Sequence, residues 1–171
     1  MFYIFTQFIG LIGLVFSLLS FQQKERKWLM VCQLIASLSF SLQLFLLGGI
    51  TGACLDIISS IRTLVFANRN KYKWASSYIW LILFVILMIA IGIITWSNVY
   101  SILPIIGSVL STIALWMKEE RKIRLISLSV GPFWLVYNLV NGAVTGALNE
   151  VIAMISIIIG IVRCDLKLSK K

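Results

Sequence analysis

The sequence predicts an all-α integral membrane protein whose seven transmembrane helices form two parallel three-helix repeats joined by a linker helix. Three observations lead to this prediction. Of the 171 residues, 60% are hydrophobic and 12% are charged, whereas a soluble domain needs more charge to cover its surface. Loops that are basic alternate with loops that carry no charge. The chain also overlays on itself after a shift of 94 residues, as in Asp56 and Glu150.

The hydrophobic runs have the length of membrane spans. At a rise of about 1.5 Å per residue, each crosses most or all of a hydrocarbon core about 30 Å thick. The runs cover residues 2–21, 28–47, 50–67, 75–96, 99–117, 123–140 and 144–163. They leave no segment for a soluble domain, so we expect a single membrane domain over residues 1–171. The opening MFYIFTQFIG lacks a basic region, which argues against a cleaved signal peptide.

The loops between the runs predict the orientation. The basic ones are QQKERK (22–27), NRNKYK (68–73), KEERKIR (118–124) and RCDLKLSKK (163–171), and the uncharged ones are GGITG (48–52), SNV (97–99) and NGAVTG (141–146). Basic loops stay on the cytoplasmic side of a membrane. We therefore expect the N-terminus outside and the C-terminus in the cytoplasm. This pattern accounts for the net charge of +9 and argues against nucleic acid as a partner, so the expected partners are membrane lipids.

The 94-residue shift aligns polar loops as well as apolar runs. Gly48 meets Gly142, and the triplet Thr-Gly-Ala follows each of them. Repeat one covers residues 10–71, repeat two covers residues 104–165, and the uncharged span 75–96 connects them. Because the linker adds one crossing, the two triplets run parallel. We expect a pseudo-two-fold axis along the membrane normal, with any binding site on that axis.

Small residues recur at matching positions of the first and fifth spans. Gly13 and Ser17 in the first span correspond to Gly107 and Ser111 in the fifth. A spacing of four keeps each pair on one helix face, where small side chains let helices approach closely. We expect these four residues to pack helices, although they could also line a substrate path.

Residue types that carry most enzyme chemistry are missing. The sequence contains no histidine, and its cysteines, Cys32, Cys54 and Cys164, are far apart. They suggest neither a metal site nor a disulfide framework. We therefore expect no metal, no cofactor and no enzymatic activity.

Charged residues inside the apolar runs are the main functional signal, because ionisable groups within a membrane are costly. Asp56 and Glu150 are repeat partners, whereas Arg62 corresponds to the neutral Ser156. Six residues turn Asp56 and Arg62 about 120° apart on the helix and separate them by about 9 Å along its axis. Glu150 across the axis is then the better partner for Arg62, with Asp56 reached through water as the alternative.

Two interpretations of these charges stay open. They form a structural ion pair that fixes the helix register, or they line a polar cavity that binds a solute or carries a proton. A lone arginine also suits an anionic or carboxylate-bearing ligand. In the sixth span, Trp134, Asn138 and Asn141 share one helix face. Trp134 is equally explained as core packing, and Asn141 as the cap of an outer turn.

Four motifs carry a family resemblance over nearly the whole chain: GLVFSLLSFQQKERK, FLLGGITGA followed by IRTL, LPIIGSVLSTIALW and GAVTGALNE. With them the chain resembles the YgjV family of bacterial inner-membrane proteins, and its repeats resemble those of the SWEET and PQ-loop (MtN3-like) transporters. The resemblance implies a bacterial inner-membrane location, the three-plus-one-plus-three fold and a transport role, but no substrate.

Transporters of the SWEET type use asparagines on the third and seventh spans and an aromatic residue on the sixth. The corresponding depths here hold Asp56, Asn149, Glu150 and Trp134. The chain departs from that pattern in having only two prolines within its spans, Pro104 and Pro132, and Phe-Gln-Gln where those proteins have Pro-Gln. Hinging at prolines, as in those proteins, is therefore not expected in the same form.

The predicted function is that of a small-solute transporter or facilitator with a polar site between the repeats. The candidate substrate-binding residues are Asp56, Arg62, Trp134, Asn138, Asn149 and Glu150. The alternative is a non-transporting membrane protein, such as an assembly partner, receptor or sensor, whose buried charges are structural. The sequence leaves the substrate, the coupling ion and the oligomeric state open, including a homo-oligomer.

Overall fold

The computed structural model describes residues 1–23, 26–69, 71–117 and 119–166. Lys24, Glu25 and Lys118, which belong to the basic loops used to predict the orientation, lie outside these described residues, as does the basic tail 167–171. Within the described ranges the structure is helical, with short connections between the helices.

The helices follow the predicted spans closely. The described chain forms α1 (Phe2–Gln22), α2 (Arg26–Leu46), α3 (Ile50–Ala67), α4 (Tyr78–Ile94), α5 (Ile102–Trp116), α6 (Glu120–Val140) and α7 (Val144–Gly160). Single turns of 3₁₀ helix precede α4 (η1, Lys73–Ser76) and α5 (η2, Val99–Ser101), and a π-helical turn (η3, Ile161–Leu166) follows α7. These turns explain why the predicted fourth, fifth and seventh spans are longer than the α-helices.

Among the described residues, five helical segments are long and apolar enough to cross a membrane: Phe2–Ser20, Ile50–Ala67, Val99–Trp116, Glu120–Val140 and Val144–Arg163. The apolar segments of α2 and α4, Met30–Leu46 and Tyr78–Ile94, are shorter, at 10–17 residues.

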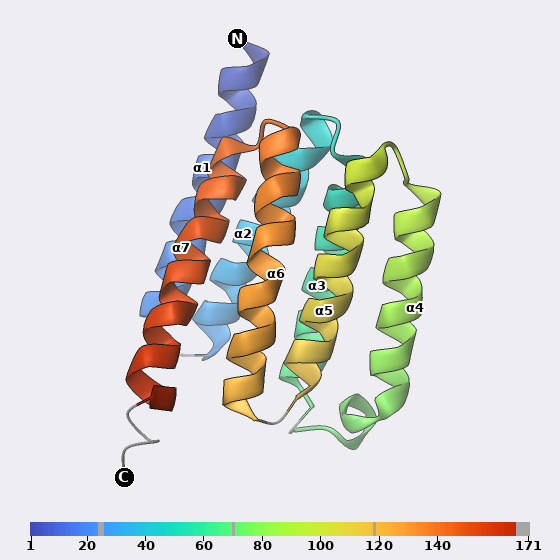
Figure 1. The fold of residues 1–171 in the computed structure, drawn as a ribbon, viewed down its shortest axis with the longest axis vertical. Helices are drawn as coiled ribbons and strands as arrows, with labels where there is room; N and C mark the ends of the chain where they lie inside the picture. Colours follow the sequence, from blue (N-terminus) through green and yellow to red (C-terminus); the bar gives the residue numbers. More distant parts are fainter. Residues whose placement is uncertain (24–25, 70, 118, 167–171) are drawn as a thin grey trace.

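Six helices contact one another in a closed sequence. The helix α2 packs against α1 and α3, α6 packs against α5 and α7, and the contacts of α3 with α5 and of α1 with α7 join the two groups. The helix α4 lies outside this closed sequence and packs against α3 and α5 (Figure 1). The start of α1 and the end of η3 lie at opposite ends of the bundle.

The turns that end α2 and α6 have the same geometry. Gly48 and Gly142 both adopt positive φ, 86° and 72°, a conformation that glycine reaches without steric cost. The next amide, at Gly49 or Ala143, donates over 2.8 Å to the carbonyl of Leu44 or Asn138. This is the Schellman arrangement, which satisfies the last carbonyls of a helix. The glycines predicted to form matching turns therefore do so.

Close helix packing surrounds the glycines predicted to provide it. A Cβ at Gly13 would lie 3.2 Å from the Ala36 carbonyl of α2, and one at Gly107 would lie 2.9 Å from the Trp134 ring of α6. The core cluster of buried residues, Leu44, Ala53, Tyr137 and Ala143, lies close to the glycine turns. Side chains on the outer faces are mostly large and apolar, as expected for a surface that meets lipid.

Candidate functional site

A cavity of about 430 Å³ lies among the six helices of the closed sequence. Its lining residues come from α1, α2, α3, α5, α6 and α7, and none comes from α4. Toward the glycine turns it is bounded by Leu44, Asn138 and Gly146. In the opposite direction it extends to Met30 near the start of α2 and Leu115 near the end of α5. The cavity therefore reaches toward the end of the bundle that carries the basic loops.

The structure brings all six predicted site residues to this one cavity: Asp56, Arg62, Trp134, Asn138, Asn149 and Glu150. The residues come from α3, α6 and α7, which are far apart in sequence. Ser17 and Ser111, predicted as packing residues, line it as well. Their helix partners Gly13 and Gly107 do not, so in each pair the glycine packs the helix and the serine faces the cavity.

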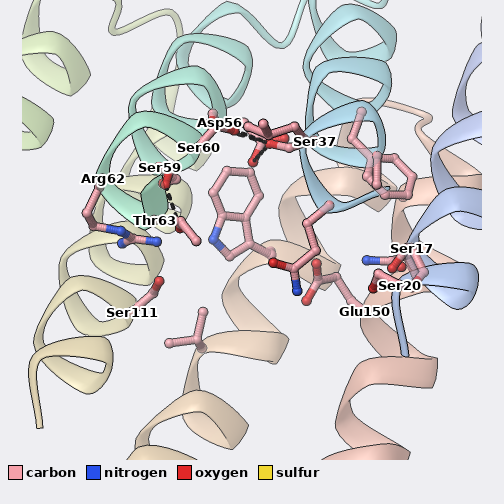
Figure 2. A pocket seen from close by; sticks show the side chains of 18 of the residues that line it. Ser17, Ser20, Ser37, Asp56, Ser59, Ser60, Arg62, Thr63, Ser111 and Glu150 are labelled. Atoms are coloured by element: carbon pink, nitrogen blue, oxygen red, sulfur yellow. Dashed lines mark hydrogen bonds between the residues drawn. The ribbon is translucent and has the colours of Figure 1, made fainter. Parts of the chain in front are cut away.

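Asp56 is held by two serines. Ser37 of α2 donates from its Oγ to Asp56 Oδ1 over 3.3 Å. The Oγ atoms of Ser37 and Ser60 lie 2.5 Å apart, and Ser60 Oγ also donates to the Asp56 carbonyl over 2.9 Å. Figure 2 shows this group on the wall formed by α2 and α3. The Ser37 hydroxyl orients the carboxyl group but brings no positive charge to it.

Arg62 lacks the carboxylate partner that the sequence suggested. Its side chain is 3% exposed, and its Nη1 donates to Thr112 Oγ1 over 2.7 Å and to the Ser108 carbonyl over 3.3 Å. Within the described residues, ion pairs shorter than 4.0 Å join Lys122 to Glu119 and Arg124 to Glu120, not Arg62 to an acid. The reason is packing, because α5 lies directly against α3. The expected ion pair with Glu150 was therefore wrong, whereas Asp56 is close enough to Arg62 for the two charges to interact electrostatically.

Glu150 extends from α7 into the cavity (Figure 2). In the part of the chain that the structure describes, its carboxylate makes no hydrogen bond and no ion pair. It is close enough to Asp56 for the two carboxyl groups to interact electrostatically. The repeat partners therefore face the same space from α3 and α7, as their matching depths predicted.

Trp134 combines the two roles left open by the sequence. It packs against the core cluster, with its ring edge-on to that of Tyr137 at 6.3 Å, and it also lines the cavity. Asn138 is 5% exposed and abuts Gly146, where a Cβ would lie 3.1 Å from the amide. Asn141 instead donates from Nδ2 to the Tyr137 carbonyl over 2.8 Å. It caps the end of α6 and does not line the cavity.

Sequence reasoning missed most of the hydroxyl lining. Ser59, Ser60 and Thr63 line the cavity beside Asp56, and they follow it by three, four and seven residues. That spacing marks one helix face, so the sequence did contain this signal. Ser37 lies on another helix, and nothing local in the sequence connects it with Asp56.

Two further polar clusters lie at the glycine-turn end and were not predicted. In the first, Gln43 Nε2 donates to Gln7 Oε1 over 2.9 Å and to Thr145 Oγ1 over 2.7 Å, which joins α1, α2 and α7. In the second, Thr51 Oγ1 donates to Ser101 Oγ over 3.2 Å. The repeat shift maps Gln7 onto Ser101 and Thr51 onto Thr145. We call these the turn-side clusters, and each closes a junction between the two groups of helices.

These features define an all-helical integral membrane protein with a polar interior cavity. Residues 4–167 match the model of the family described as "Bacterial inner membrane protein", Imp-YgjV. The chain belongs to this family. It is 24% identical over 148 residues to "Inner membrane protein YgjV" of Escherichia coli (strain K12), across 86% of this chain and 78% of that protein.

The match confirms the predicted family and the predicted location in the bacterial inner membrane. Both descriptions state a location and no activity. No solved structure matches the chain significantly. The likeness to SWEET and PQ-loop transporters therefore stays a prediction.

Proposed function

We propose that this protein is a small-solute transporter or facilitator that binds its solute in the cavity between two parallel three-helix repeats. The observation that carries the proposal is the cavity itself, to which both halves contribute a carboxyl group, Asp56 and Glu150. Pockets of a few hundred cubic ångströms with a few polar groups are typical of small-molecule sites. A protein that used these charges only for packing would have little reason to leave this space open.

The helix contacts support the three-plus-one-plus-three arrangement proposed here. The junction of α3 with α5 corresponds, under the repeat shift, to the junction of α7 with α1, and both junctions exist. The helix α4 packs outside and contributes nothing to the cavity lining. A site shared by two such repeats suits transport in which one repeat rocks against the other.

The proposed orientation puts the basic loops in the cytoplasm and the glycine turns outside. In that orientation the cavity extends toward the cytoplasm, and the turn-side clusters close its outer end. Transport would then require the bonds of Gln43 with Gln7 and Thr145 to break, and those of Thr51 with Ser101. Such hydrogen bonds can break and re-form during transport, since each contributes only about 0.5–1.5 kcal/mol net to stability.

The test is uptake into liposomes that contain the purified protein. The panel includes a sugar, an amino acid, a carboxylate and an organic cation, each labelled and compared with protein-free liposomes. We expect at least one solute to enter faster, and Glu150→Gln to change that rate. Glu119→Gln is the matched control, because Glu119 is exposed and pairs with Lys122. Equal rates with and without protein for the whole panel would contradict the proposal.

One observation favours the alternative, a non-transporting assembly partner, receptor or sensor. Arg62 is hydrogen-bonded to α5, as a purely structural charge would be. Under this alternative, neutralising Asp56 or Glu150 lowers stability and no solute moves. The uptake panel therefore separates the two functions.

A further inference from the structure

The ionisable side chains of the cavity carry an unbalanced charge. Among its described lining residues, the ionisable ones are Asp56, Arg62 and Glu150. With all three ionised, two carboxylates and one guanidinium leave one net negative charge. A net charge in a low-dielectric interior is costly unless a counter-ion accompanies it or a proton neutralises it.

The positive charge is also committed elsewhere. Arg62 directs Nη1 to Thr112 and Ser108 on α5, whereas Glu150 faces the cavity without a hydrogen bond from another described residue. Among the described residues, the carboxyl group of Asp56 accepts a hydrogen bond from one neutral hydroxyl, that of Ser37. The group that would complete this site is therefore a cation, not the anion that the lone arginine suggested from sequence.

The size and the walls of the cavity favour an organic cation over a metal ion. A space of about 430 Å³ exceeds the needs of a bare ion, and its lining includes the rings of Phe40 and Trp134. No group of three metal-ligating side chains occurs in the searched, described residues. Aromatic faces attract ammonium groups, and more strongly where water is excluded.

We propose that the cavity binds a monovalent organic cation of the substituted-ammonium class. Its charged nitrogen lies between Asp56 and Glu150, and its apolar body contacts Trp134 and Phe40. The assignment rests on the proposed function, since it names the solute class of the same cavity.

The first experiment uses the unaltered protein in detergent and measures binding by calorimetry. The cationic probes are tetramethylammonium, choline and benzyltrimethylammonium. The control probe is 3,3-dimethylbutan-1-ol, which has the shape of choline with carbon in place of the charged nitrogen, and benzoate tests an anion. We expect at least one cation to bind about tenfold or more tightly than the alcohol and benzoate. Binding of benzoate or the alcohol as tight as that of the cations, or no binding by any cation, would overturn the assignment.

The second experiment uses isosteric variants. Asp56→Asn and Glu150→Gln should each weaken binding of the tightest cation by about tenfold, which is about 1.4 kcal/mol, and Glu119→Gln should not. Arg62→Gln should strengthen cation binding, whereas an anion site would respond in the opposite direction. Thermal unfolding of each variant checks that the fold is retained. Unchanged affinity in both folded acid variants would overturn the assignment.

Binding and uptake distinguish the two proposals. Cation binding without uptake of any solute would support the ligand class and contradict transport. Uptake of a sugar or a carboxylate, without binding of the cations, would support transport and contradict the ligand class.

Discussion

Replacing Thr112 by valine tests whether Arg62 is anchored on α5. Thr112 Oγ1 accepts the shorter of the two hydrogen bonds from Arg62 Nη1, at 2.7 Å, and the Ser108 carbonyl accepts the other at 3.3 Å. Arg62 Nε is already buried without a partner. Valine keeps the shape of threonine and replaces its hydroxyl with a methyl group, which cannot accept the bond. A hydrogen bond to a charged group is worth about 1.5–3 kcal/mol, and we expect Thr112→Val to cost about that much.

The assay is reversible unfolding in mixed micelles of a mild detergent and SDS, followed by circular dichroism. Thr63→Val is the matched control. Like Thr112, Thr63 donates to the carbonyl four residues earlier, here that of Ser59 over 2.8 Å, but it receives nothing from Arg62. We expect Thr63→Val to cost less than about 1 kcal/mol. Equal costs for the two variants would refute the anchoring of Arg62 on α5.

The remaining predictions concern stability in the same assay. Tyr137→Phe should cost about 1–2 kcal/mol, because the Tyr137 hydroxyl accepts the Gly52 amide at 3.1 Å and buried donors near a helix start need partners; no loss would contradict this. Gly52→Ala should cost about 1–3 kcal/mol, since its Cβ would clash with the Tyr137 ring. The Cβ that Gly48→Ala adds would have no atom within 4 Å, so we expect a cost of about 1 kcal/mol from the positive φ alone. A cost larger than that of Gly52→Ala would contradict this ranking. Ser108→Ala should be neutral or slightly stabilising, because its Oγ is buried without a partner, and a loss above about 1 kcal/mol would show that the hydroxyl is bonded.

Much of the fold was predictable because bilayer spans impose long apolar runs and glycine marks positive φ. The third span was predicted at residues 50–67 and α3 covers Ile50–Ala67. The matching turns at Gly48 and Gly142 followed from the repeat. The lengths of α4 and α5 were overestimated, because apolar content does not distinguish an α-helix from a 3₁₀ turn such as Val99–Ser101.

The cavity residues were predictable for a different reason. A polar side chain within an apolar run avoids lipid and faces the protein interior. The repeat places Asp56 and Glu150 at the same depth. Hydrogen-bond partners were not predictable in this way. The turn-side cluster of Gln7, Gln43 and Thr145 depends on which helices touch, and one sequence does not give that order.

The anchoring of Arg62 could nevertheless have been inferred from departures from the repeat. The shift of 94 residues maps Arg62 of α3 onto Ser156 of α7, and it maps Thr112 of α5, whose hydroxyl accepts from Arg62, onto Leu18 of α1. The junction of α3 with α5 thus has an arginine bonded to a threonine, and the corresponding positions of the other junction hold a serine and a leucine.

A buried guanidinium without acceptors is costly, and the Thr112 hydroxyl supplies an acceptor that a leucine would lack. The arginine and the threonine are therefore matched departures from the repeat. Their joint occurrence at one junction indicates that Arg62 belongs to the contact between α3 and α5, and it leaves Asp56 and Glu150 free to face the cavity.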